Sequence, residues 1–395
     1  MMPAVPTPYS SKTTLWLLML GNVCIGTGTM IVVGLLNQIS ASLAVSVSQA
    51  AQLLTAFAVA CAVGAPVCAA LLAGVSRRGV LAAALVLFAL CHALAAVVDS
   101  YPLLLALRAF TGLGAAIFTP AAAAVAGQLV PPEQRGRAVG FVFLGWGVAS
   151  VFGVPLGSYL GAVYHWHAAM GVVAAMSLVV AVGVWLTVPN SLAANRVNLA
   201  AFAGLLRNRP VMRVVGVTVL YATGLFTMFA YLSPLYRDVV GASPTQIPLL
   251  FFVYGAMGLA GSALMARHID RIGAGHMVGL MIGASCCVLA IWPLSALHIS
   301  LAFLVAMIWG APGFAANGAQ QARIVGMVGA MAPVGVAFNS SAMYIGQALG
   351  SVIGGVYYAQ ALGWGLPRWG LAWLGLAAAL AALGLSRSVE RARGA

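Results

Sequence analysis

Long apolar stretches recur along the whole chain, separated by short polar segments. Each stretch is close to or longer than the roughly 20 residues that an α-helix needs to cross a hydrocarbon layer about 30 Å thick. The pattern predicts an all-α polytopic membrane protein with twelve transmembrane helices. Their expected ranges are 14–36, 49–75, 79–98, 101–127, 137–163, 166–188, 212–236, 246–266, 276–296, 298–322, 331–360 and 366–386.

The chain repeats itself at a long interval. The segments 153–164 and 346–357 share glycines at four-residue spacing, and each matching position differs by 193. A second match, between 76–79 and 270–273, differs by 194. We therefore predict two similar six-helix bundles, 1–188 and 212–395, joined by a cytoplasmic linker at 189–211. A repeat of this kind suits a transporter, because two bundles can rock about a site held between them near the bilayer midplane.

Composition supports the membrane assignment. The chain is 63% hydrophobic and 6% charged, whereas soluble proteins carry about a quarter charged residues. Its net charge of +13 does not indicate nucleic-acid binding, because the basic residues fall in short loops instead of on one face of a soluble fold. Fifteen bases lie on one side of the predicted membrane and two, Arg237 and Arg368, on the other. This bias places both termini in the cytoplasm.

Several simpler chemistries are not expected. The six cysteines fall within predicted helices without metal-ligand spacing, so we expect neither disulfides nor a metal site. Neither a phosphate-binding loop nor a catalytic cluster at membrane depth can be assembled, so we expect no cofactor and no enzymatic activity. Seventeen arginines against one lysine suggest a GC-rich bacterial genome. We therefore expect a multi-pass monomer in the lipid bilayer of a bacterial inner membrane.

Charge is scarce within the predicted helices. All five acidic residues map to loops or helix ends, which argues against a cationic substrate and weakens a proton-antiport mechanism. Arg108 lies inside a helix, at a cost of about 2.5 to 3.5 kcal/mol. It either binds substrate and assists coupling or binds the carbonyls of neighbouring helices. His92 either carries a proton or is a neutral side chain bonded to a neighbouring helix.

Local motifs resemble the major facilitator superfamily over about residues 14–386. The segments 108–114 and 132–138 are similar to the family's Arg-containing fourth helix and its following loop. Gly145, Gly153, Pro155 and Gly157 match the Gly-Pro motif of its antiporter branch. The segments 34–39, 153–157 and 339–350 resemble the bacterial drug and sugar efflux group. The resemblance implies a major facilitator fold and proton-coupled export.

The gating motif departs from the family pattern in the first half. Ser76 stands where the resemblance implies an Asp, whereas the second copy retains Asp270. The candidates for coupling and gating are Arg108, His92, Arg77, Asp270, Arg271, Gly153 and Pro155.

The helices expected at the centre carry mostly uncharged hydrogen-bonding groups, which suit a small-molecule site with a few polar anchors. The candidate substrate-binding residues are Asn22, Thr29, Arg108, Tyr221, Thr227, Tyr231, Asn317, Asn339 and Tyr344. We expect an exporter of a small neutral or weakly acidic organic solute, such as a drug, sugar or nucleoside. Proton coupling, uncoupled facilitation and a sensor built on a transporter scaffold all stay open.

Overall fold

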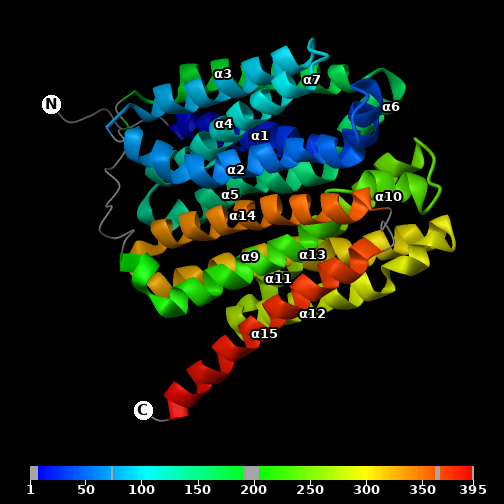
Figure 1. Cartoon of the computed structure of the whole chain (residues 1–395). Coiled ribbons are helices and arrows are strands. Elements are labelled where there is room, and N and C mark those ends of the chain that lie inside the picture. The colour runs from blue at the N-terminus through cyan, green and yellow to red at the C-terminus, as the bar shows by residue number, and fades with distance from the viewer. Residues whose placement is uncertain (1–7, 73, 191, 193–203, 361–364, 394–395) are drawn as a thin grey trace.

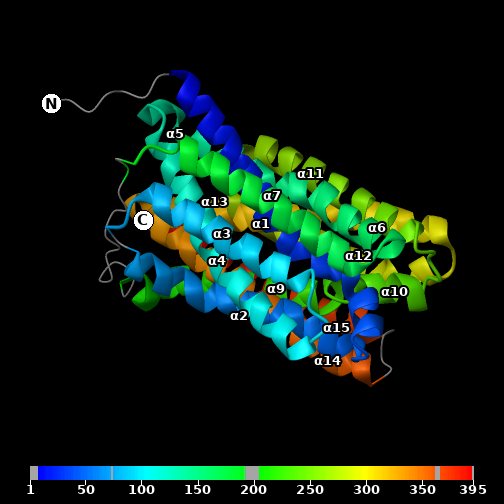
Figure 2. The same ribbon diagram turned by 90° about the horizontal axis from the view of Figure 1, so that it is seen from above.

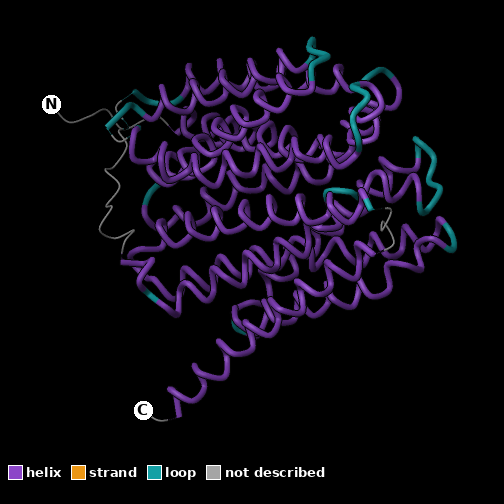
Figure 3. Tube along the Cα trace, viewed as in Figure 1, coloured by secondary structure: helices purple, strands orange, loops and turns teal. Residues whose placement is uncertain are grey.

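Helices make up nearly all of the structure. The computed structural model describes residues 8–72, 74–190, 192, 204–360 and 365–393, and these residues form helices and turns with no β-strand (Figure 3). The predicted linker at 189–211 lies partly outside the described residues. The all-α architecture expected from the apolar pattern is confirmed.

The N-terminal half forms the upper group of helices in the view of Figure 1. Its helices are α1 (Pro8–Ser42), α2 (Val47–Leu71), α3 (Arg77–Ala95), α4 (Tyr101–Gln128), α5 (Arg135–Val148), α6 (Val154–Val163) and α7 (Trp166–Thr187). Serines precede two of these helices, α3 and α4. Ser76 caps α3 by accepting a hydrogen bond from the backbone nitrogen of Gly79.

The C-terminal half forms a second group below the first, and Figure 2 shows the same helices from above. Its helices are α9 (Arg209–Phe229), α10 (Leu232–Asp238), α11 (Gln246–Ile272), α12 (Ala274–Ile291), α13 (Ile299–Val328), α14 (Ala332–Ala359) and α15 (Leu366–Arg393). Where the halves meet, α14 packs against α2, and α11 packs against α6. Ten spans within the described residues are long and apolar enough to cross a membrane.

Two of the predicted spans contain interruptions, although each still forms one candidate membrane span, Arg135–Val163 and Arg209–Asp238. The span 212–236 is divided, because α9 ends at Phe229 and α10 begins at Leu232. The span 137–163 contains a π-helical segment, Ala149–Gly153, between α5 and α6. Pro155 lies two residues after this segment, in the first turn of α6, and its missing N–H and bulky ring disturb the preceding turn of an α-helix. A local π-bulge is one way in which a helix accommodates such a disturbance.

Glycines bring helix backbones into close contact in the C-terminal half. A Cβ atom added at Gly350 on α14 would lie 2.5 Å from the carbonyl oxygen of Thr223 on α9. The matching glycine of the first half, Gly157, would instead meet the side chain of Ile31, at 2.2 Å. The repeated motif therefore serves backbone contact in one bundle and side-chain packing in the other.

Candidate functional site

The two halves are joined by hydrogen bonds near one end of the molecule. The hydroxyl of Ser48 on α2 donates to the carbonyl of Gly355 on α14 at 2.8 Å. The hydroxyl of Ser351 on α14 donates in the opposite direction, to the carbonyl of Ala51 on α2, at 3.1 Å. Each helix thus supplies one hydroxyl and one backbone carbonyl to a reciprocal pair of neutral bonds.

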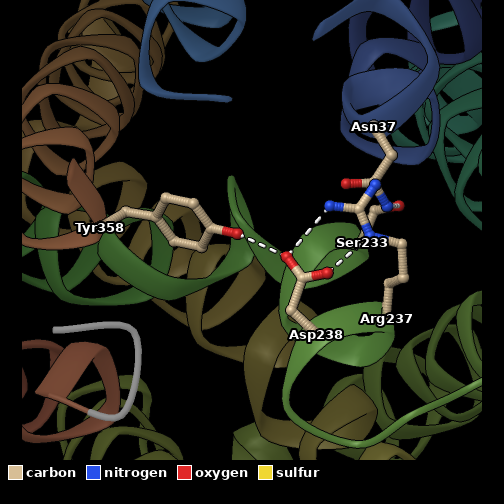
Figure 4. Close-up of polar contacts among 5 residues, drawn as sticks. All are labelled: Asn37, Ser233, Arg237, Asp238 and Tyr358. Carbon is tan, nitrogen blue, oxygen red and sulfur yellow. Dashed lines mark hydrogen bonds and ion pairs between the residues drawn. The ribbon is translucent and has the colours of Figure 1, made fainter. Parts of the chain in front are cut away.

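The short helix α10 adds a second contact at the same end (Figure 4). The side-chain nitrogen of Asn37 on α1 donates to the hydroxyl of Ser233 at 3.2 Å, and that hydroxyl donates to the carbonyl of Gly34 at 3.5 Å. Asp238, at the end of α10, accepts from Arg237 at 2.6 Å and from the hydroxyl of Tyr358 at 2.8 Å. The helix is therefore held by α1 across the interface and by α14 within its own half.

The middle of the interface contains aromatic and polar side chains. The rings of Phe57 on α2 and Tyr344 on α14 meet edge to face, with centroids 6.3 Å apart. Tyr344 also shares a side-chain hydrogen bond with Cys61 on α2. Farther from Ser48, the polar side chains of Asn22 and Asn339 bond within their own halves. We refer to the end with Ser48, Gly355, Asn37 and Ser233 as the tied end.

Arg108 is bound by backbone carbonyls. Its side chain is 2% exposed, and it donates to the carbonyl oxygens of Gly28 and Thr29 on α1 at 2.8 and 3.3 Å. The guanidinium also lies 4.8 Å from the centre of the Phe57 ring, a favourable place for a cation. This arrangement matches the structural alternative for Arg108, in which its donors join neighbouring helices.

His92 lies in the same region. It is 1% exposed, its Nδ1 is 2.9 Å from the carbonyl oxygen of Phe88 one turn earlier, and its ring packs on that of Phe88. A Cβ atom at Gly28 would lie 2.7 Å from His92 Nε2, so His92 and Arg108 approach the same stretch of α1. His92 Nε2 itself has no hydrogen-bond partner among the described residues.

The N-terminal half contains an uncharged polar cluster that links three helices. The side-chain nitrogen of Asn22 on α1 donates to the carbonyl of Val142 on α5 at 3.0 Å. Its side-chain oxygen accepts from the hydroxyl of Thr119 on α4 at 2.9 Å. Asn22 is fully buried, whereas Thr119 is half-buried.

The C-terminal half contains a similar cluster on the corresponding helices. Thr218 on α9 donates to the side-chain oxygen of Asn339 on α14 at 2.7 Å, and Asn339 donates to that of Asn317 on α13 at 3.2 Å. Gln320, also on α13, donates to Thr218 at 3.0 Å and to the carbonyl of Val214 at 2.9 Å. Asn317 is half-buried and the other side chains are buried.

Other predicted binding residues donate hydrogen bonds to backbone carbonyls. The hydroxyls of Thr29 and Thr227 donate to carbonyls one turn earlier in their own helices. The hydroxyl of Tyr221 donates to the carbonyl of Gly313, and that of Tyr231 donates to the carbonyl of Ser351 at 2.8 Å. The structure thus brings Asn317 and Asn339 together, places Asn22 in the other half, and distributes the remaining candidates through the scaffold.

The predicted gating residues lie apart from these clusters. Arg77 begins α3, and its backbone nitrogen donates to the carbonyl of Leu192 at 2.8 Å. Asp270 and Arg271 are exposed at the end of α11, where Asp270 forms no ion pair among the described residues. Gly153 packs against Thr27 on α1, next to the half-buried Pro155.

An apolar cavity of about 70 Å³ lies beside the π-helical segment. Its lining includes Val23, Ile31, Phe152, Leu156 and Met176 from α1, the π-helical segment, α6 and α7. An engineered cavity that admits benzene is about 150 Å³. This cavity is therefore too small and too apolar for a polar organic solute.

Sequence reasoning missed the serines of the tied end, which are Ser48, Ser233 and Ser351, and it missed Thr218. Serines at helix ends usually cap helices and serines inside helices usually bond their own backbone, so their sequence positions gave no specific signal. Thr218 had a usable signal, because it lies near the position in the second half that corresponds to Asn22 in the first.

Comparisons with known proteins agree with this architecture. The family described as Major Facilitator Superfamily matches residues 18–332. The chain is 28% identical over 374 residues to the inner membrane transport protein YdhP of Escherichia coli K12, covering 94% of this chain and 96% of that protein. It is 30% identical to a chloramphenicol resistance protein of Streptomyces lividans, with 90% and 91% covered. A probable sugar efflux transporter of Pasteurella multocida is 25% identical, with 90% and 86% covered.

Among solved structures, the chain is similar to a bacterial homologue of the human lysosomal transporter Spinster in an inward-facing, unoccupied conformation. The TM-score is 0.74 at 17% identity, with 96% of this chain and 97% of that chain covered. At this identity the likeness shows the shared fold.

Proposed function

Because this chain belongs to the major facilitator superfamily of membrane transporters, we propose that it exports a small neutral or weakly acidic organic solute by alternating access. A drug, a sugar and a nucleoside are the substrate types under consideration. One observation carries the proposal. Neutral hydrogen bonds join the two halves near one end, while uncharged polar clusters lie in the part of each half farther from that end.

The character of these contacts supports reversible opening. A neutral hydrogen bond contributes only about 0.5 to 1.5 kcal/mol net, so a few such bonds can form and break during a transport cycle. The relatives point in the same direction, since their names include a sugar efflux transporter and a chloramphenicol resistance protein. The uncharged clusters fit neutral solutes better than ions.

The proposed topology adds α14 and α15 to the ten candidate spans, which gives twelve transmembrane helices. We place the bundles at 1–188 and 212–395, the linker 189–211 and both termini in the cytoplasm, and the monomeric protein in a bacterial inner membrane. With this orientation the tied end faces outward, and solute enters from the cytoplasm.

We place the solute near the half-buried ends of the two polar clusters, with Asn22, Asn317 and Asn339 as site residues. Tyr344 stands beside them at the interface. Arg108, Tyr221 and Tyr231 hold neighbouring helices together, whereas Thr29 and Thr227 bond within their own helices. For the motion, the proposed hinge is Gly153 and Pro155, and the proposed gating charges on the cytoplasmic side are Arg77, Asp270 and Arg271.

Flux into proteoliposomes tests the proposal. Labelled monosaccharides, nucleosides and chloramphenicol would be offered with and without an imposed pH gradient. Accumulation above equilibrium only with the gradient would establish proton-coupled transport, whereas equilibration indifferent to the gradient would identify a facilitator. Absence of flux for every solute, together with measurable binding, would favour a sensor and overturn the proposal.

A further inference from the structure

The polar cluster of the C-terminal half has a fixed hydrogen-bond direction. The carbonyl of Val214 can only accept, so the side chain of Gln320 must present its NH₂ group there, at 2.9 Å. The same nitrogen donates to the hydroxyl of Thr218 at 3.0 Å. A threonine hydroxyl has one hydrogen. That of Thr218 faces two acceptors, the side-chain oxygen of Asn339 at 2.7 Å and the carbonyl of Val214 at 3.4 Å, and the shorter contact assigns it to Asn339.

The same order of donors and acceptors extends to Asn317, the half-buried residue of the cluster. Because the oxygen of Asn339 faces Thr218, its NH₂ group faces Asn317 and donates to the oxygen of that amide at 3.2 Å. The NH₂ group of Asn317 is left with two donor hydrogens and makes no further hydrogen bond among the described residues. Since Asn317 is half-buried, the C-terminal half presents a donor there.

The N-terminal half ends in the opposite polarity. The carbonyl of Val142 can only accept, so Asn22 presents its NH₂ group to it at 3.0 Å. The oxygen of Asn22 then accepts the single hydrogen of Thr119 at 2.9 Å. The half-buried hydroxyl of Thr119 retains its lone pairs, so this half presents an acceptor.

The two clusters lie at matching depth. Along α1, Asn22 is 15 residues from Asn37, and along α9 and α10, Thr218 is 15 residues from Ser233. Since α1 is continuous, Asn22 lies about 22 Å from Asn37 at 1.5 Å per helical residue. The path from Thr218 to Ser233 has the same number of residues and includes the turn at 230 and 231 between α9 and α10. Thr119 and Asn317 therefore occupy corresponding helices, α4 and α13, in the half of the molecule opposite the tied end.

We propose that Thr119 and Asn317 are the two polar ends of one solute site with a fixed polarity. The site selects an uncharged solute that turns an acceptor, such as a carbonyl or hydroxyl oxygen, toward Asn317 and a donor, such as a hydroxyl or amide hydrogen, toward Thr119. This inference rests on the proposed function and narrows its substrate class to neutral solutes that carry both groups. Hydrocarbons and simple ions are excluded.

Two nearly isosteric variants test the polarity. Asn317→Leu removes the donor, and Thr119→Val removes the acceptor. Flux would be measured in proteoliposomes with chloramphenicol and a monosaccharide panel, followed by the deoxy and deoxyfluoro analogues of each solute that wild type transports. Fluorine accepts weakly and cannot donate, so it distinguishes the two roles of a hydroxyl.

The wild-type protein should transport the deoxy and deoxyfluoro analogues at different rates from the parent solute, and the pattern should differ between two positions of the solute. Where a hydroxyl donates to Thr119, the deoxy and fluoro analogues should both be transported about three- to tenfold more slowly. Where an oxygen accepts from Asn317, the fluoro analogue should retain more flux than the deoxy analogue. Thr119→Val should abolish the rate differences at the position that faces residue 119 and keep those at the other position. Asn317→Leu should abolish only the rate differences at the position that faces residue 317.

Thr187→Val is the matched control, because Thr187 is a half-buried threonine on α7 that bonds a carbonyl of its own helix, that of Gly183. It should keep the rate differences at both positions. If Asn317→Leu fails to fold, Asn317→Asp keeps the shape and the bond from Asn339 but presents an acceptor. It should then favour amino analogues at the position that faces residue 317.

Two failures are distinguishable. No flux of any solute by wild type would reject the proposed function. The polarity inference would be overturned if wild type transports a solute normally and the preferences among its analogues are unchanged in Asn317→Leu and Thr119→Val, or in Asn317→Asp. The transporter assignment would then remain intact.

Discussion

The side-chain nitrogen of Asn37 on α1 donates to the hydroxyl of Ser233 on α10 across 3.2 Å, which joins the two halves through a neutral hydrogen bond. The same hydroxyl donates to the carbonyl of Gly34. One serine therefore holds both a donor and an acceptor of the opposite half. No charge is needed for this closure, so it should depend little on salt or pH.

Removing the serine hydroxyls should loosen the tied end. With a net contribution of about 1 kcal/mol for each bond, Ser233→Ala, which loses the bonds to Asn37 and Gly34, should raise the population that is open at this end by roughly thirtyfold. Ser48→Ala should act in the same direction through the loss of its bond to Gly355. Distances between spin labels placed on α2 and α14 would report the shift.

The control for this experiment is Ser243→Ala, which removes a hydroxyl from the loop before α11 without touching the interface. It should leave the distance distribution unchanged. If Ser233→Ala and Ser48→Ala together also leave it unchanged, the serine bonds do not govern closure of this end.

Matched glycines of the repeat should respond differently to substitution. Gly350→Ala places a Cβ atom 2.5 Å from the backbone oxygen of Thr223 and 2.8 Å from the backbone nitrogen of Thr227, so two helices must separate. Gly157→Ala meets the side chain of Ile31, which can move. We expect Gly350→Ala to destabilise the protein by about 1 to 3 kcal/mol and Gly157→Ala by clearly less.

Thermal unfolding of both variants in the same detergent would measure the difference. Gly279→Ala, at a position where a Cβ atom meets nothing within 4 Å, serves as the control. Equal losses for Gly350→Ala and Gly157→Ala would contradict the asymmetry between the bundles.

The sequence predicted the helical architecture and the polar character of the interior because apolar length and the scarcity of charge are properties of composition. Pro234 indicated a break near the end of α9, because its ring clashes with the carbonyl of residue 230 and it cannot donate to that carbonyl. The sequence did not predict that a short separate helix, α10, follows the break. Nor could it predict which partner each hydroxyl takes. A threonine such as Thr227 can bond its own helix, whereas Thr218 bonds Asn339 on another helix, and only packing distinguishes the two.

His92 offers a direct test of proton coupling. Its ring is fully buried and approaches Gly28, whose carbonyl already binds Arg108, so a second positive charge there would be repelled. We expect His92→Gln to leave the pH dependence of flux unchanged within twofold. Loss of gradient-driven accumulation in a folded His92→Gln protein would instead show that His92 carries the transported proton.

Arg108 can be assigned to scaffold or to substrate by a conservative change. In Arg108→Lys a charge remains, but an ammonium group cannot reproduce the planar fork that reaches the carbonyls of Gly28 and Thr29 while stacking on Phe57. Loss of one charge-assisted hydrogen bond should lower the free energy of unfolding by about 1.5 to 3 kcal/mol. The affinity of the folded variant for a transported solute should stay within threefold of wild type, because the guanidinium is 2% exposed.

Equilibrium unfolding and solute binding, both measured on one preparation, separate the two roles. Arg78→Lys is the control, because Arg78 is a half-buried arginine at a helix end. Unchanged stability with a tenfold loss of affinity would assign Arg108 to the solute.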